Sequence, residues 1–145
     1  MLIPIYRSSL RSFNLHPKCI IKDGQPVAFG ENGYVVPAIG PSFLGFSYNS
    51  FDYKKSIIYD ENIKILVYCG EFGEYGLSED LFDDSFHKLK PHDRVCIKNG
   101  KISSCDYNKK EKDISFGYVR ESDYREDNVQ YIIILVTNIV IWKGE

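Results

Sequence analysis

The sequence is poor in alanine and methionine. Its 145 residues include only Ala28, Ala38 and one Met, against 11 Tyr and 9 Phe. Alanine is the strongest helix former, whereas aromatic and β-branched side chains lose rotamer freedom in a helix and pack well on a pleated sheet. The scarcity of alanine therefore argues against a helical bundle and predicts a mainly β protein.

The sequence also lacks an excess of charge, paired cysteine motifs and long apolar runs. A net charge of −2 gives no global positive field, so nucleic acid and anionic membranes are not expected partners. The four cysteines have no C-x-x-C or C…H spacing, and we expect free thiols, no metal site and no cofactor. The longest apolar stretch, 131–142, is shorter than the roughly 20 residues that cross a bilayer. With no signal-peptide pattern at the start of the chain, we expect a soluble protein made in a cytoplasm.

The first 18 residues differ from the rest of the chain. They carry three basic side chains and no acidic one, with scattered apolar residues and prolines at positions 4 and 17. Neither helical nor strand periodicity persists there. We therefore expect an extended N-terminal arm over residues 1–18 and a single β domain over residues 19–145. Two interpretations of the arm stand equally: a partner surface takes it up as an added strand, or it is a disordered tail.

Short apolar segments separated by turn residues follow the arm. Asp23-Gly24, Asn32-Gly33 and Asn99-Gly100 mark turns, and Asn-Gly is typical of a two-residue hairpin because both central residues need positive φ. One helix is predicted, over residues 78–90, where Ser78 can cap the first turn and apolar residues recur at helical spacing. The fold class is thus a compact, barrel-like β domain with one short helix.

No group of residues predicts catalysis or metal binding. The three histidines, at positions 16, 87 and 92, accompany no nucleophile motif. The acidic run at 79–84 lacks the spacing of a calcium loop, and Gly70-x-x-Gly73-x-x-Gly76 lacks the Lys-Ser/Thr of a phosphate-binding loop, so we expect a solvated surface and a flexible turn. We expect no enzymatic activity.

The order of these segments resembles the small decoration, or structural cement, proteins of tailed-bacteriophage capsids. That family shows a polar G-D-x-V-y-v-x-x-G-k segment followed by an i-G-y-v strand, and His92 stands where the pattern has its first glycine. The resemblance covers roughly residues 20–136. It rests on these segments: Asp23-Gly24-Gln25-Pro26-Val27, Asn32-Gly33-Tyr34-Val35-Val36-Pro37, Leu44-Gly45-Phe46, Lys64-Ile65-Leu66-Val67, Pro91-His92-Asp93-Arg94-Val95, Asn99-Gly100-Lys101-Ile102 and Phe116-Gly117-Tyr118-Val119.

The resemblance implies a barrel-like or β-tulip domain on the outside of a virion. Such a protein bridges neighbouring major capsid subunits, often forms trimers and has no enzymatic activity. Arginine and aromatic side chains are the usual anchors of protein interfaces. The residues that we expect to contact the capsid are Ile3, Ile5, Arg7, Leu10, Arg11 and Phe13, with Trp142 as a secondary anchor.

Several alternatives remain open. Trp142 and the apolar residues before it can instead turn a last hairpin into the core. A carbohydrate- or cell-surface-binding module would cluster exposed tyrosines on one concave face. A small enzyme would place His87 or His92 beside a carboxylate in a deep pocket. If the arm is independent of the domain, deleting residues 1–13 should leave thermal unfolding nearly unchanged and abolish capsid binding.

Overall fold

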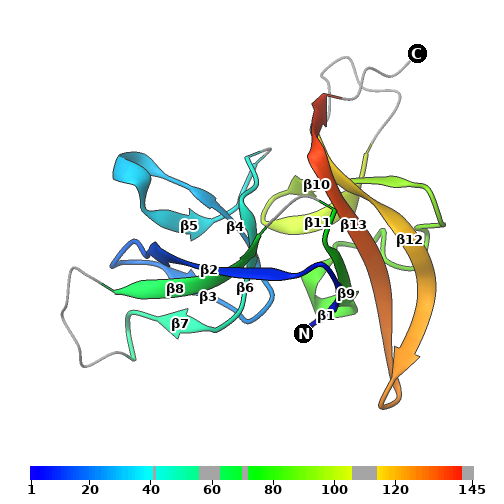
Figure 1. Cartoon of the computed structure of the whole chain (residues 1–145), viewed down its shortest axis with the longest axis horizontal. Coiled ribbons are helices and arrows are strands. Elements are labelled where there is room, and N and C mark those ends of the chain that lie inside the picture. The colour runs from blue at the N-terminus through cyan, green and yellow to red at the C-terminus, as the bar shows by residue number, and fades with distance from the viewer. Residues whose placement is uncertain (41, 56–62, 70–71, 106–113, 142–145) are drawn as a thin grey trace.

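In the computed structural model the chain forms antiparallel sheets arranged as two adjoining lobes (Figure 1). The structure describes residues 1–40, 42–55, 63–69, 72–105 and 114–141. Sheet A has the strand order β1 (Leu2–Tyr6), β9 (Glu74–Ser78), β13 (Val129–Ile141), β12 (Ile114–Glu126), β10 (Arg94–Lys98) and β11 (Lys101–Ser104). Sheet B has the order β2 (Ser9–Asn14), β8 (Lys64–Cys69), β6 (Gly45–Ser47), β4 (Pro26–Phe29) and β5 (Val35–Pro37), and sheet C pairs β3 (Ile20–Ile21) with β7 (Phe51–Asp52). The predicted mainly β class is confirmed, as open sheets with edge strands.

Sheet A forms one lobe, and sheets B and C form the other (Figure 1). The larger of two core clusters spans both lobes and combines residues of sheet A with Ala28, Phe46 and Tyr68 of sheet B. At the junction the Phe46 ring centroid lies 5.3 Å from that of Tyr75 on β9 and 6.0 Å from that of Phe116 on β12. A second cluster fills sheet B and the segment around β3, and consists of Leu15, Cys19, Ile21, Val27, Val35, Ile65 and Val67. Part of the aromatic excess in the sequence is thus used where the sheets meet.

Two of the predicted Asn-Gly turns connect paired strands, and one of them is the expected two-residue hairpin. Asn99 and Gly100 have φ of 51° and 79° and join β10 to β11, which pair from Lys98↔Lys101 onward. Asn32 and Gly33 also have positive φ and lie in the 3-10 turn η1 (Glu31–Gly33) between β4 and β5. Gly24 has φ of 77°, but its turn leads from sheet C into sheet B. Local turn chemistry is therefore retained in the fold.

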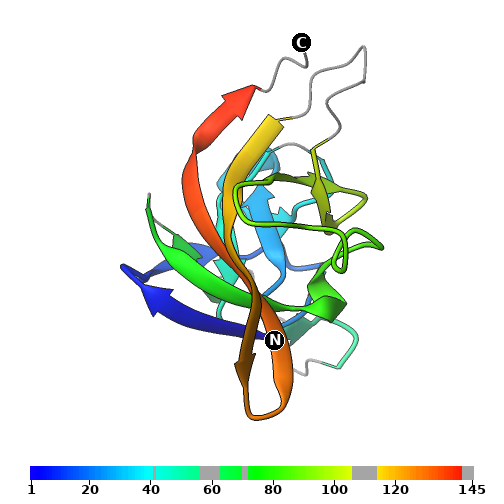
Figure 2. The ribbon, with the colours of Figure 1, turned by 90° about the vertical axis from the view of Figure 1, so that its right-hand side faces the viewer.

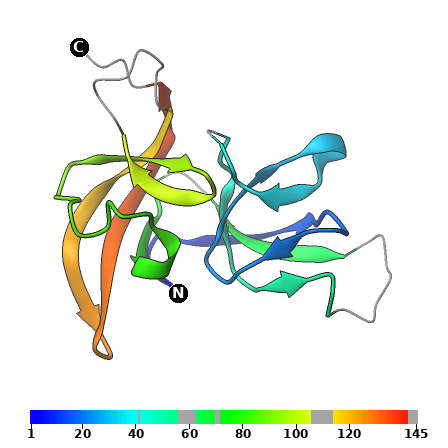
Figure 3. The same cartoon turned by 180° about the vertical axis from the view of Figure 1, so that it is seen from behind.

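The helix predicted over residues 78–90 is wrong. The structure has a three-residue 3-10 helix, η2 (Glu79–Leu81), followed by turns (Figure 3). The apolar residues whose spacing indicated a helix are nevertheless buried in the shared core: Phe82, Phe86 and Leu89. Phe82 forms a bridge to Ile102 of β11, and pairing with a strand requires extended backbone there instead of a helical turn.

The charged run 120–127 is part of the longest hairpin in the described chain. β12 and β13 each have 13 residues and turn at Asp127 and Asn128, both with positive φ. Figure 2 shows β1, β9, β13 and β12 side by side in this twisted sheet. The sequence signal was the Asp-Asn pair, which tolerates positive φ as Asn-Gly does.

Candidate partner-binding edge

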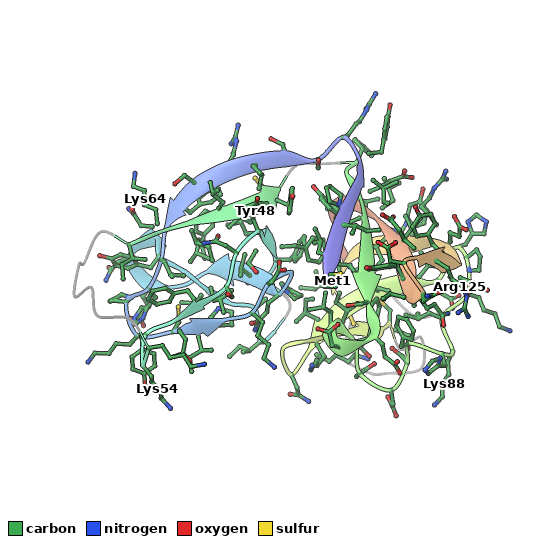
Figure 4. The ribbon with its side chains drawn as sticks, turned by 90° about the horizontal axis from the view of Figure 1, so that it is seen from below. Met1, Tyr48, Lys54, Lys64, Lys88 and Arg125 are labelled. Atoms are coloured by element: carbon green, nitrogen blue, oxygen red, sulfur yellow. The ribbon has the colours of Figure 1, made fainter. Side chains whose placement is uncertain are left out.

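The N-terminal segment forms an outer strand of both large sheets. β1 pairs with β9 of sheet A from Leu2↔Leu77 to Tyr6↔Glu74, and β2 pairs with β8 of sheet B from Ser9↔Cys69 to Asn14↔Lys64. Figure 4 shows this segment running along one side of the molecule from Met1 in one lobe towards Lys64 in the other. The expected separate arm of residues 1–18 is thus paired within its own chain, so neither a disordered tail nor a free strand describes it.

Part of the predicted contact set is used inside the molecule. Ile3 packs on Gly76, where a Cβ would lie only 2.7 Å from Ile3 Cγ1. Phe13 packs against the second core cluster, with its ring centroid 5.5 Å from that of Phe29 in an edge-to-face arrangement. Both side chains are half-buried. Glycine 76, expected in a flexible turn, lies inside β9 and makes room for Ile3.

The other predicted contact residues face solvent. Ile5 is 39% exposed and Leu10 44% exposed, and Arg7 and Arg11 are exposed as well. Arg7 has φ of 52° at the junction of β1 and β2, and its guanidinium lies 5.3 Å from the Tyr6 ring centroid. Trp142 lies outside the described residues. Four of the seven predicted positions are therefore available on the described surface.

Three of the four outer edges of sheets A and B are covered or interrupted within the described residues. β11 receives a hydrogen bond from the Asp83 N–H to the Ile102 carbonyl at 3.0 Å. β5 receives one from the His16 N–H to the Val35 carbonyl at 3.0 Å. β1 contains Pro4, which has no N–H to offer. Native sheets protect their edges by such devices because an open strand pairs with other chains.

The fourth edge, β2, has no such protection among the described residues. It contains no proline, and no described strand lies outside it. The Leu15 N–H donates to the Ile63 carbonyl at 2.8 Å, which shows that the odd-numbered residues turn their backbone groups towards β8. Because these groups alternate along an antiparallel strand, Leu10, Ser12 and Asn14 direct theirs outward. β2 thus presents three outward N–H and carbonyl pairs.

An exposed apolar patch borders this open edge. Cross-strand partners lie on the same face, so Leu10, opposite Tyr68, shares a face with Leu66, opposite Ser12. Leu66 is 38% exposed, and Tyr48, whose N–H donates to the Leu66 carbonyl at 2.8 Å, is 47% exposed. We call Leu10, Tyr48 and Leu66 the edge patch.

Two members of the edge patch, Leu66 and Tyr48, were not predicted from the sequence. The sequence of segment 63–69 indicates a core strand, which gives no reason to expect that Leu66 is exposed. The available signal was its period of two: Lys64 and Leu66 share the face opposite the buried Ile65 and Val67. Tyr48 follows β6 directly, in a segment whose other aromatic residues are core residues.

The charge beside the edge is positive. Arg11 lies on the opposite face from the edge patch, across from Val67. Burial raises the pKa of the Cys69 thiol, and the nearby Arg11 guanidinium partly opposes that rise. Within the described ranges, Arg11 forms no ion pair, and Lys64 lies across from Asn14 at the end of β2. An anionic side chain placed next to Arg11 would therefore gain an uncompensated partner.

The geometry gives the enzyme and carbohydrate alternatives no support. His87 Nε2 lies 2.7 Å from Glu79 Oε1, but both side chains are about two-thirds exposed at the surface. Among the described tyrosines the most exposed are Tyr6, the last residue of β1, and Tyr48 and Tyr53, which follow β6 and β7, so they belong to three different sheets. In the part of the chain that the structure describes, no three His, Cys, Asp or Glu residues converge as metal ligands. No disulfide joins any of the four cysteines.

Comparison with known proteins adds no relative. No protein-family model matches the chain, and no curated protein is significantly similar to it. Among the described helices none has the length and apolarity to cross a membrane. Any functional interpretation therefore depends on the surface itself.

Proposed function

We propose that this protein is a non-enzymatic structural protein that binds the outside of a viral capsid and stabilises the shell by bridging major capsid subunits. The observation that carries the proposal is the open β2 edge with its exposed apolar neighbours, because a six-residue unprotected strand is a liability unless a partner covers it. The proposed contact surface follows the β2 edge, with the edge patch on one face of sheet B and Arg11 on the other, and continues to Ile5 and Arg7.

The backbone at His92 supports the resemblance to capsid decoration proteins. His92 stands where the family pattern has glycine, and it adopts φ of 76°, a conformation that glycine favours. The following segments of the pattern also have the implied form. β10 begins at Arg94, Asn99-Gly100 is its hairpin turn, and Gly117 lies in β12 opposite Val95.

The stabilising action would follow from mass action. A protein that binds assembled capsid subunits and not free ones shifts the equilibrium towards the assembled shell. Such a function needs many weak, identical contacts and no catalytic group. A trimer, which the resemblance implies for many members, would multiply the contacts of each copy.

Co-sedimentation with empty capsid shells from the same source tests the proposal. The wild-type protein should co-sediment at a copy number commensurate with the major capsid protein. A variant with Ile5→Ser and Leu10→Ser should lose at least about tenfold in affinity, which corresponds to about 1.4 kcal/mol. Ile39→Ser is the matched control, because Ile39 is 76% exposed and follows β5, the strand at the opposite edge of sheet B from β2.

Two outcomes would reject the proposal. One is the absence of the wild-type protein from sedimented shells. The other is equal loss of binding in the control, which would mean that apolar exposure in general, rather than this face, causes the association. The sedimentation behaviour of the free protein gives its oligomeric state in the same experiment.

A further inference from the structure

We propose that β2 binds one extended segment of the partner protein as an added antiparallel strand, and that this segment alternates apolar and acidic side chains. The inference rests on the proposed function and names the partner chemistry of the same surface. It follows from three properties of β2: the direction of its backbone groups, the side chains on its two faces, and its charge.

The backbone fixes how the added strand would pair. Leu10, Ser12 and Asn14 direct their N–H and carbonyl groups outward, so a partner strand can form ladder hydrogen bonds at these three positions without displacing β8. The remaining strands of sheet B are all paired antiparallel, and an added antiparallel strand would extend that order. Main-chain bonds of this kind give affinity without sequence preference.

The side chains fix which residues the added strand should carry. A partner residue opposite Leu10 lies on the face of the edge patch, where an apolar side chain would cover Leu10 and extend the contact to Leu66. The next partner residue points to the other face, beside Arg11. A carboxylate there would pair with a guanidinium that has no ion-pair partner within the described residues. The partner pattern is therefore apolar, acidic, apolar.

A second copy of this chain fits the edge less well. In a symmetric dimer, the outward N–H and carbonyl groups of one β2 must face those of the other β2. The two antiparallel registers that meet this condition with the most paired residues place Arg11 opposite either Arg11 or Phe13 of the second copy. In both registers two basic edges adjoin, each with Arg11 and Lys64, and residues 1–18 contain no acidic side chain to compensate them. Like charges across neighbouring strands are destabilising.

Synthetic peptides test the inference directly. The probe is Ac-Thr-Val-Glu-Val-Glu-Val-Thr-NH2, with a counterpart in which lysine replaces both glutamates. Titration into the 15N-labelled full chain should shift the amide signals of β2, and the acidic peptide should bind at least about tenfold more tightly than the basic one. The acidic peptide with N-methyl groups on the amides that face β2 should lose binding, because it no longer has the backbone N–H donors that pair with β2. Its side chains are unchanged, so the loss would be due to the backbone hydrogen bonds.

Charge reversal checks the role of the guanidinium. Arg11→Glu should remove or invert the preference for the acidic peptide. Arg125→Glu, a variant of the same charge change at an exposed arginine in the other lobe (Figure 4), should leave that preference intact.

Several results would overturn the inference: no binding by either peptide, equal binding by both, or shifts that map away from β2. Concentration-dependent shifts of β2 without peptide would assign the edge to a second copy. Failure of the inference is distinguishable from failure of the proposed function. Shells that bind the Arg11→Glu variant as well as wild type would refute the strand assignment alone, and peptide binding without shell binding would reject the capsid proposal alone.

Discussion

Two leucines five residues apart in the N-terminal segment should lose very different amounts of stability on the same substitution. Leu15 is 1% exposed and belongs to the second core cluster, whereas Leu10 is 44% exposed at the open edge. Leu→Ala at a fully buried position costs about 2–5 kcal/mol, because transfer free energy is lost and a cavity remains. We therefore expect Leu15→Ala to lower the free energy of unfolding by about 3 kcal/mol. For a chain of this size that corresponds to a fall in Tm of roughly 10 °C.

Leu10→Ala should change that free energy by about 1 kcal/mol or less, since much of the side chain is already in water. Urea unfolding followed by tryptophan and tyrosine fluorescence measures both variants against wild type. If Leu15→Ala were as stable as wild type, the segment would not be docked as described, and the expectation that residues 1–13 can be deleted without loss of stability would be restored. The described pairing predicts instead that this deletion destabilises both sheets.

Two further predictions concern the interior. Gly45→Ala should lower the free energy of unfolding by about 1–3 kcal/mol, because the added Cβ would lie 2.1 Å from the Tyr68 carbonyl oxygen. The control Gly40→Ala should leave stability unchanged, because no atom lies within 4 Å of its added Cβ. Equal denaturation midpoints for the two variants would contradict this prediction. Burial raises the pKa of the Cys19 thiol to about 11 and, with the neighbouring Cys69 and Tyr68, that of the Tyr75 hydroxyl to about 12. As the pH rises, both groups lose their protons at a lower pH in the unfolded chain than in the folded one. The free energy of unfolding should therefore keep its full value below about pH 9 and fall between about pH 9 and 12. Tyr75→Phe should flatten the upper part of that fall, and superimposable pH profiles would exclude the assignment.

The candidate site was predictable in part. Ile5, Leu10 and Arg11, which are exposed, were predicted as contact residues because an aperiodic segment with apolar and basic residues indicates a surface reserved for contact. The same reasoning also named Ile3 and Phe13, which pack within the molecule, since side chains in such a segment look alike in sequence whether they face a partner or their own sheet. Leu66 was missed for the converse reason: it is an exposed residue among the apolar neighbours Ile65, Val67 and Tyr68, which are buried.

The sequence alone determined the β class and the turns at Asp23-Gly24, Asn32-Gly33 and Asn99-Gly100. Alanine scarcity and aromatic content reflect backbone preferences that each residue has on its own. Asn99-Gly100 forms a hairpin turn because these two residues themselves readily adopt positive φ. The burial of Phe82 and Phe86 was likewise local information, although the predicted helix around them was not formed because Phe82 pairs with β11.

Only the tertiary structure decided what the first 18 residues do. Their strands pair with β8 and β9, fifty or more residues further along the chain, and no local preference specifies such partners. Long-range pairing also decided which edges are covered: Asp83 and His16 protect β11 and β5, while nothing described covers β2. An open edge is a property of the assembled sheet, because it is defined by which backbone groups remain unpaired after every other strand has found its place.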